Sequence, residues 1–113
     1  MKKSEIKFIV ELDNENIPEK IMWDADEKEG TGLTETKSIS LSLWDHENKN
    51  TMRIDLWSKD MPVDEMKHFY IDCLGGLSQS ILNATGDEYM SQEISAVCDK
   101  LVKHVQAQDN SKA

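Results

Sequence analysis

The sequence predicts an α+β domain, a four-stranded antiparallel sheet (a meander) with two C-terminal helices packed on one face. Two observations predict this class. Apolar residues recur at every second position up to residue 60 and at helical spacing beyond it. All the predicted strands precede both helices, and this order argues against a parallel sheet built from alternating strands and helices. With 113 residues, the chain is long enough for one domain with a single hydrophobic core.

Four segments have the period-two pattern of half-buried strands, and their expected bounds are about residues 5–12, 19–25, 35–45 and 50–58. A turn-like run over 13–18 joins the first two, and a turn over 46–49 joins the last two. Registers follow from placing apolar residues opposite each other on one face. The selected pairs are Val10–Ile21, Phe8–Trp23, Glu11–Lys20 and Lys7–Asp24 in the first hairpin, and Leu43–Met52, Leu41–Ile54 and Ile39–Leu56 in the second.

Two amphipathic helices are expected over about residues 62–84 and 87–107, within a single domain that spans residues 1–107. We expect Asp60 as the N-cap of the first helix and Gly86 as its end. A capping box of Thr85 and Glu88 is expected to start the second helix. Residues 108–113 are assigned to a flexible tail, because they offer nothing to bury.

Two adjacent glycines, Gly75 and Gly76, lie in the middle of the first predicted helix, where glycine is unfavourable. Close packing against a neighbouring element and a break in the helix are the two interpretations. Replacing Gly75 with alanine would stabilise the protein if the glycines are merely tolerated.

The composition argues against several kinds of partner. The 22 acidic and 13 basic side chains give a net charge of -9 and a pI near 4.7, which oppose binding to nucleic acid and to anionic lipid. No apolar run approaches the roughly 18 residues of a membrane span, and no export signal is visible. Cys73 and Cys98 are too few for a disulfide framework. We therefore expect a soluble, cytoplasmic protein that neither binds nucleic acid nor inserts into a membrane.

The sequence contains no short catalytic fingerprint, such as a phosphate-binding glycine loop, a zinc-protease helix or a nucleophile elbow. Asp64, His68 and Asp72 follow one another at steps of four residues, but a solvated helix face explains them without a metal, because no fourth ligand lies at motif spacing. Both cysteines fall on or beside apolar stripes, as small buried residues do. We predict no enzyme activity, catalytic residue, metal or cofactor.

The sheet face turned away from the helices is expected to be only partly polar. The interface candidates on it are Ile9, Met22, Trp44, Arg53 and Trp57. Tryptophan and arginine are enriched at the centres of protein interfaces. Cover by flanking loops is the alternative interpretation. The sequence does not separate binding to another protein from self-association, so a homo-oligomer stays open.

Three strings of the sequence carry a resemblance to a known family: KKSEIKF near the start, MRIDLWSKDMPVDEMKHFY over residues 52–70, and ATGDEYM over residues 84–90. They resemble the GldC family of bacterial gliding motility proteins, over nearly the whole chain. The resemblance implies a small soluble accessory of gliding that is associated with type IX secretion and acts alongside a motility lipoprotein. It supplies no catalytic residues.

The predicted function is a non-catalytic accessory protein of the gliding machinery that acts through protein–protein interaction. The alternative is a SecB-like chaperone or client-binding protein linked to secretion, on the analogy of four strands followed by helices. A third hypothesis is an enzyme or small-ligand carrier that uses a cleft between the helices and the sheet.

Overall fold

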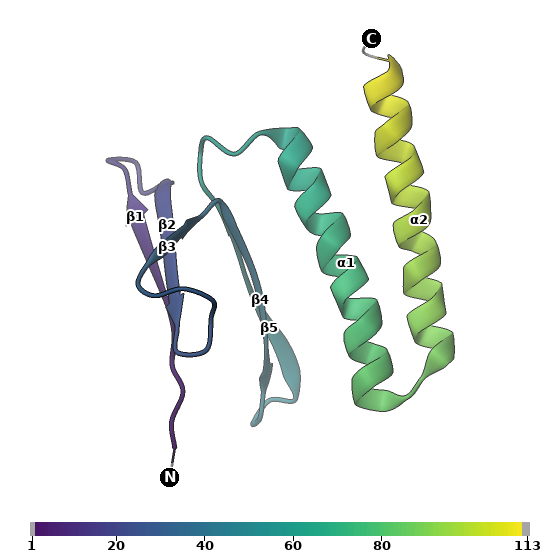
Figure 1. The fold of residues 1–113 in the computed structure, drawn as a ribbon, viewed down its shortest axis with the longest axis horizontal. Helices are drawn as coiled ribbons and strands as arrows, with labels where there is room; N and C mark the ends of the chain where they lie inside the picture. Colours follow the sequence, from purple (N-terminus) through teal and green to yellow (C-terminus); the bar gives the residue numbers. More distant parts are fainter. Residues whose placement is uncertain (1, 112–113) are drawn as a thin grey trace. The chain divides into compact units, whose positions relative to one another are not determined.

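The computed structural model describes residues 2–111, which form two compact units with their boundary between Met61 and Pro62 (Figure 1). The first unit contains β1 (Ile6–Leu12), β2 (Pro18–Ala25), β3 (Thr34–Thr36), β4 (Ser38–Asp45) and β5 (Asn50–Trp57). The second contains α1 (Val63–Thr85) and α2 (Glu88–Ser111). The α+β class, the antiparallel strands and the two C-terminal helices are confirmed. Packing of the helices on one face of a sheet stays a prediction, as does the single domain over residues 1–107.

The described strands form two antiparallel sheets, so the prediction of one four-stranded sheet is wrong. One sheet has the order β1-β2-β3, and the other is the β4–β5 hairpin. The segment expected as one strand over 35–45 is interrupted at Lys37. Thr36 pairs with Ile21 of β2, whereas Ser38 pairs with Trp57 of β5. The chain thus changes partner at this point, and the regular alternation of apolar residues did not reveal the change.

All the predicted registers within the two hairpins are confirmed. The observed pairs include Val10–Ile21, Phe8–Trp23, Glu11–Lys20, Lys7–Asp24, Leu43–Met52, Leu41–Ile54 and Ile39–Leu56. A slip by one residue would turn every apolar side chain to the other face, which explains why the pattern specifies the register so strongly.

The segment that follows β5 ties the two sheets together at a corner. The backbone N–H of Ser58 donates to the carbonyl of Lys37 at 2.8 Å, and that of Lys59 donates to the carbonyl of Pro18 at 2.9 Å. The Lys37 ammonium lies 3.0 Å from a carboxylate oxygen of Asp60, which also accepts a hydrogen bond from the buried Ser58 hydroxyl. Asp60 is therefore not the N-cap that the sequence predicts, and Pro62 occupies that position without a side-chain cap.

The aliphatic core of the first unit lies at this corner. Ile21 is fully buried, and Ile39 is almost so. Exposure rises along the hairpin away from the corner, to 51% at Leu43 on β4 and 58% at Met52 on β5. The apolar face of the β4–β5 hairpin is therefore closed at the corner and open at its turn.

The second unit is a helical hairpin held together by small polar side chains. The Ser78 hydroxyl on α1 lies 2.7 Å from the carbonyl oxygen of Ser91 and 2.7 Å from the hydroxyl of Ser95, both on α2. The Ser91 hydroxyl in turn donates to the Ser78 carbonyl at 2.9 Å. Ser78 and Ser91 are buried, so these bonds satisfy polar groups that water does not reach.

Gly86 ends α1 in the left-handed conformation, with φ 71°, and its N–H bonds to the Leu82 carbonyl, which confirms the predicted stop. The predicted capping box is wrong. Thr85 belongs to α1 and donates its hydroxyl to the Ile81 carbonyl, whereas the Asp87 carboxylate accepts the Met90 N–H at 3.0 Å at the start of α2.

Both helices lie close to their predicted bounds, but α2 continues past the expected end at residue 107 to Ser111. The Lys67 ammonium donates to the side chain of Gln108 at 2.9 Å, which anchors this last part of α2 to α1. Residues 108–111 of the predicted tail therefore continue the helix, and residues 112–113 lie outside the described residues. In the described part of the chain, neither helix combines the length and the apolar character needed to cross a bilayer.

Candidate interaction face

One face of the β4–β5 hairpin gathers three of the five interface candidates. The register places eight side chains on this face, here called the serine–tryptophan face: Ser38, Ser40, Ser42 and Trp44 from β4, and Thr51, Arg53, Asp55 and Trp57 from β5. Trp44 is 65% exposed near the turn, opposite Thr51. Trp57 is 47% exposed at the corner, opposite Ser38. The two indole rings thus lie at opposite ends of the face.

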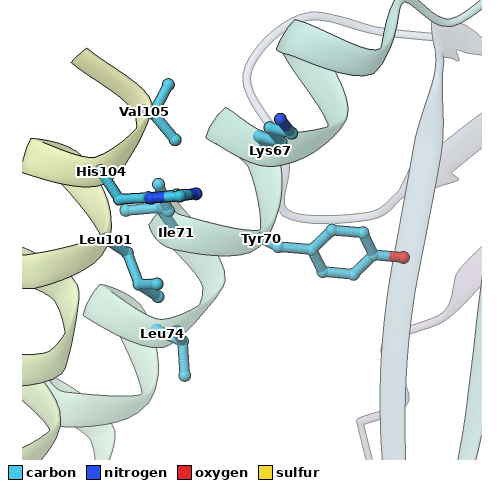
Figure 2. A pocket seen from close by; sticks show the side chains of 7 residues that line it. All are labelled: Lys67, Tyr70, Ile71, Leu74, Leu101, His104 and Val105. Atoms are coloured by element: carbon cyan, nitrogen blue, oxygen red, sulfur yellow. The ribbon is translucent and has the colours of Figure 1, made fainter. Parts of the chain in front are cut away.

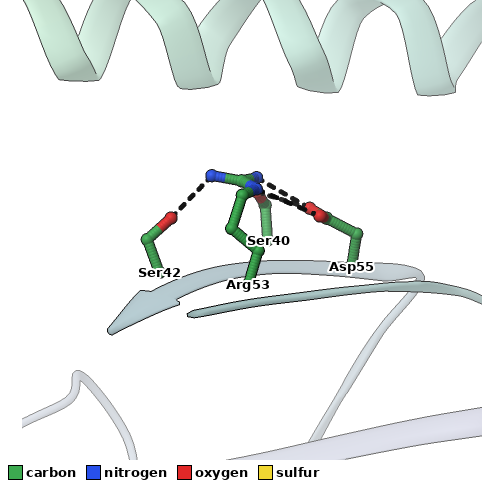
Figure 3. Close-up of polar contacts among 4 residues, drawn as sticks. All are labelled: Ser40, Ser42, Arg53 and Asp55. Atoms are coloured by element: carbon green, nitrogen blue, oxygen red, sulfur yellow. Dashed lines mark hydrogen bonds and ion pairs between the residues drawn. The ribbon is translucent and has the colours of Figure 1, made fainter. Parts of the chain in front are cut away.

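The register places Arg53 between these tryptophans. Four hydrogen bonds hold its side chain (Figure 3). Its Nη1 donates to the Ser42 hydroxyl at 2.6 Å, and its Nη2 to the Ser40 hydroxyl at 2.7 Å. Nη2 and Nε also donate to the two carboxylate oxygens of Asp55, at 2.9 and 3.2 Å. The planar guanidinium binds three acceptor side chains at once, which a lysine ammonium does not do as well.

The charges at the centre of the face are balanced. The Arg53 guanidinium, and then the Ser40 hydroxyl, lower the pKa of Asp55 below its usual value. The carboxylate therefore stays ionised and paired at neutral pH. A partner that covers this centre meets an ion pair whose hydrogen bonds are already formed, rather than a lone charge whose burial would be costly.

A small cavity of about 180 Å³ adjoins Trp57 at the corner. Its lining consists of Ile17, Pro18, Asp55, Leu56, Trp57 and Lys59. The Lys59 ammonium lies 3.1 Å from Asp13 and 3.4 Å from Glu19, and the bond to Asp13 raises the lysine pKa. The sequence did not predict this cavity, because Ile17 and Pro18 lie in or next to the first turn and reach β5 only through the corner.

The other two interface candidates, Ile9 and Met22, lie in the three-stranded sheet. They pair directly with each other, and Met22 also pairs with Glu35 of β3. Lys7, Asp24, Glu11 and Lys20 share their face. The structure therefore divides the five candidates between two sheets and does not join them in one patch of neighbouring strands.

A second cavity, of about 250 Å³, lies within the helical hairpin (Figure 2). Its lining consists of Lys67, Tyr70, Ile71, Leu74, Leu101, His104 and Val105. The aliphatic members come from the apolar stripes of α1 and α2, so this groove is suited to apolar groups. The third hypothesis from the sequence places a cleft between the helices and the sheet, whereas this cavity is lined only by residues of α1 and α2.

Asp64, His68 and Asp72, the side chains with the helical spacing of possible metal ligands, do not form a site in the described structure. Within residues 2–111, no group of three or more histidine, cysteine, aspartate or glutamate side chains is arranged to hold a metal ion. Asp64, His68 and Asp72 thus share a helix spacing without forming a ligand cluster.

The fold and this surface define a small α+β protein with a strand hairpin, a helical hairpin and an exposed aromatic face. The family model described as gliding motility-associated protein GldC-like matches residues 18–107, and the chain belongs to this family. The family resemblance is therefore confirmed over residues 18–107, which contain the second and third sequence strings and the whole serine–tryptophan face. No curated protein and no solved structure matches the chain.

Proposed function

We propose that this chain is a non-catalytic accessory protein of the bacterial gliding machinery that binds another protein through the serine–tryptophan face. Membership of the GldC-like family supports the association with gliding. The observation that carries the choice of surface is the ordered Arg53 side chain between the exposed Trp44 and Trp57. Tryptophan and arginine are the residue types that most often dominate binding energy.

The geometry suits this role because the central side chain is already ordered. Immobilising a long side chain on binding costs roughly 0.5–1.5 kcal/mol. The bonds from Arg53 to Ser40, Ser42 and Asp55 reduce that cost before a partner arrives. The two indole rings then supply the apolar area, at roughly 150–250 Å² each when buried.

The proposed partner is a protein component of the gliding apparatus, and a motility lipoprotein is one candidate. We also propose an association with type IX secretion. The partner and this association are both implied by the family resemblance. We further propose a cytoplasmic location. The sequence contains only two cysteines, too few for a disulfide framework, and this supports a compartment in which thiols stay reduced.

The experiment is an affinity capture from a gliding bacterium with the tagged chain. We compare the wild type, a Trp44→Ser, Trp57→Ser double variant and a Tyr89→Ser control, since Tyr89 is an exposed aromatic residue on α2. The double variant should lose a motility component that the wild type and the control retain. Retention of that component by a folded double variant would count against the proposed face.

Client binding of the SecB-like kind is the second candidate, and the apolar groove of the helical hairpin favours it. A client-binding protein would suppress the aggregation of an unfolded protein, and a charge in the groove, as in Leu101→Glu, would abolish the effect. The Trp44→Ser, Trp57→Ser variant would keep full protection in that case. Absence of protection by the wild type would exclude this candidate.

A further inference from the structure

The outer edge of β4 presents backbone groups to a further strand. Within residues 2–111, β4 pairs only with β5. Lys37 and Ser58 form the next pair beyond Ser38 and Trp57 in the β4–β5 register, and the Ser58 N–H bonds to the Lys37 carbonyl. Hydrogen-bonded and non-hydrogen-bonded pairs alternate along an antiparallel ladder, so the odd-numbered residues of β4 bond to β5. The N–H and C=O groups of the even-numbered residues therefore point to the outer edge.

An independent contact confirms this direction. The Thr36 hydroxyl donates to the carbonyl of Ser38 at 3.1 Å, as an outward-pointing carbonyl allows. Ser40, Ser42 and Trp44 continue the same edge towards the turn.

The sequence and pairing of this edge contain none of the residues or irregularities that usually prevent strand addition. Lysine, proline, inward-pointing charges and bulges protect the edges of natural sheets. Residues 38–44 read SISLSLW, with no charge and no proline, in a chain of which 31% is charged, and the register of β4 with β5 is regular throughout. A two-stranded sheet is also marginally stable by itself, so β4 would gain stability from another strand.

We propose that β4 pairs antiparallel with β4 of a second copy of this chain, giving a four-stranded intermolecular sheet in the order β5-β4-β4-β5. This inference concerns the edge of the hairpin and does not rest on the proposed function of its serine–tryptophan face.

The sequence of β4 selects one register for this pairing. Symmetric pairing about Leu41 sets Ser40 opposite Ser42 and Ile39 opposite Leu43, so that like side chains share a face. It also sets Lys37 opposite Asp45 of the second copy, once at each end of the ladder. Over the same residues, a centre at Ser40 would set the Lys37 charge opposite the apolar Leu43, and a centre at Ser42 would oppose Ile39 to Asp45.

Charge complementarity favours a second copy as the occupant. Two chains of net charge -9 repel each other, so their contact must be free of like charges. Over residues 37–45, the Leu41-centred ladder meets this condition and adds two opposite-charge pairs. The Lys37 ammonium has three donors, of which Glu35 and Asp60 use two, at 3.3 and 3.0 Å, so one is left for Asp45.

Cross-linking tests the pairing and its register. In the proposed ladder, Leu41 faces its own copy in a non-hydrogen-bonded pair, with Cα atoms about 4.5 Å apart, which a disulfide can span. Under mild oxidation, Leu41→Cys should form a covalent dimer. Ile54→Cys is the matched control, because Ile54 is the partner of Leu41 on β5 and shares its face. The wild type, with Cys73 and Cys98, gives the baseline. No dimer above that baseline, or equal yields from both variants, would overturn the proposal.

Sedimentation of two variants at one position tests the edge itself. Ser42→Pro removes an outward N–H, whereas Ser42→Ala removes only the hydroxyl that accepts from Arg53. The wild type and Ser42→Ala should be dimers, and Ser42→Pro should be a folded monomer. A wild type that is monomeric at micromolar concentration would overturn the proposal that a second copy pairs with β4. The same conclusion would follow if β4 paired only with a strand of a different protein. If proline disturbs the fold of the hairpin, the comparison of Leu41→Cys with Ile54→Cys still tests the pairing of β4 with a second copy.

Discussion

Arg53 and Asp55 lie two residues apart on β5, on the same face, and are joined by two hydrogen bonds, from Nε to Oδ2 at 3.2 Å and from Nη2 to Oδ1 at 2.9 Å. Since the same guanidinium also binds Ser40 and Ser42 of β4, this pair orders the centre of the serine–tryptophan face across both strands. The order of the face therefore depends on one planar side chain.

Arg53→Lys should weaken partner binding while leaving the thermal unfolding midpoint nearly unchanged. A lysine keeps the charge but cannot reproduce the planar fork that binds Ser40, Ser42 and Asp55 together. Quantitative capture of the partner and a thermal melt measure the two effects. Lys103→Arg, at an exposed position of α2, is the control and should bind as the wild type does. Wild-type binding by Arg53→Lys would show that the fork has no role.

The first unit should lose stability in acid. Hydrogen bonds lower the folded-state pKa of three aspartates. Asp13 accepts from the backbone N–H groups of Ile17 and Glu15. Asp55 accepts from the Arg53 guanidinium, and Asp60 accepts from the Ser58 hydroxyl. A folded pKa below the unfolded value means that the unfolded chain binds more protons. The stabilisation is complete above the unfolded value, about pH 4, and is lost as the pH falls towards the folded pKa.

Tryptophan fluorescence reports this acid transition selectively, because all three tryptophans lie in the first unit. Asp13→Asn should flatten the fall in stability below about pH 4, since it removes one of the shifted carboxylates. Asp99→Asn, on an exposed turn of α2, should keep the wild-type profile. An identical profile for Asp13→Asn and the wild type would contradict the assignment.

Gly75→Ala and Gly76→Ala should each stabilise the protein by about 1 kcal/mol, the usual difference between glycine and alanine within a helix. α1 continues without a break through both residues. Apart from the chain neighbours and the adjacent backbone of α1 itself, a Cβ atom at either position would meet no atom within 4 Å. Denaturant unfolding measures the change. Destabilisation would instead support the close packing that the sequence left open. Gly86→Ala is the contrasting control, and it should destabilise because Gly86 has a φ of 71°.

Ser78→Ala should destabilise the helical hairpin by about 1–3 kcal/mol, because the buried Ser91 carbonyl loses a donor and the Ser95 hydroxyl loses its partner on α1. Ser95→Ala removes one bond at an exposed residue and should cost less. Urea unfolding followed by far-UV circular dichroism gives both values. Equal costs would mean that Ser78 is not the centre of this contact.

Much of the fold follows from local pattern. The period of two specifies each hairpin register, since only one register pairs apolar residues on one face, as for Leu41 and Ile54. Gly86 marks the end of α1 by its left-handed conformation. The division into two sheets was not predictable in this way, because the chain changes its pairing partner from β2 to β5 at Lys37 without any break in the alternation of apolar residues.

The candidate site was predictable in part. Trp44, Arg53 and Trp57 fall on one face by strand alternation and the confirmed register. The cavity beside Trp57 was not predictable, because its wall comes from Ile17 and Pro18 across the corner. At Lys37 the strand pairing changes from β2 to β5, and this change places Ile9 and Met22 in a different sheet from the other three candidates.

Site-specific photo-cross-linking in gliding cells tests the central claim most directly. Thr51 lies on the serine–tryptophan face opposite Trp44, whereas the adjacent Met52 points to the apolar face of the same strand, and both are exposed. A photoreactive residue at position 51 should capture a motility protein, and one at position 52 should not. Capture of that protein from position 52 and not from position 51 would contradict the proposal that this chain binds its partner through the serine–tryptophan face.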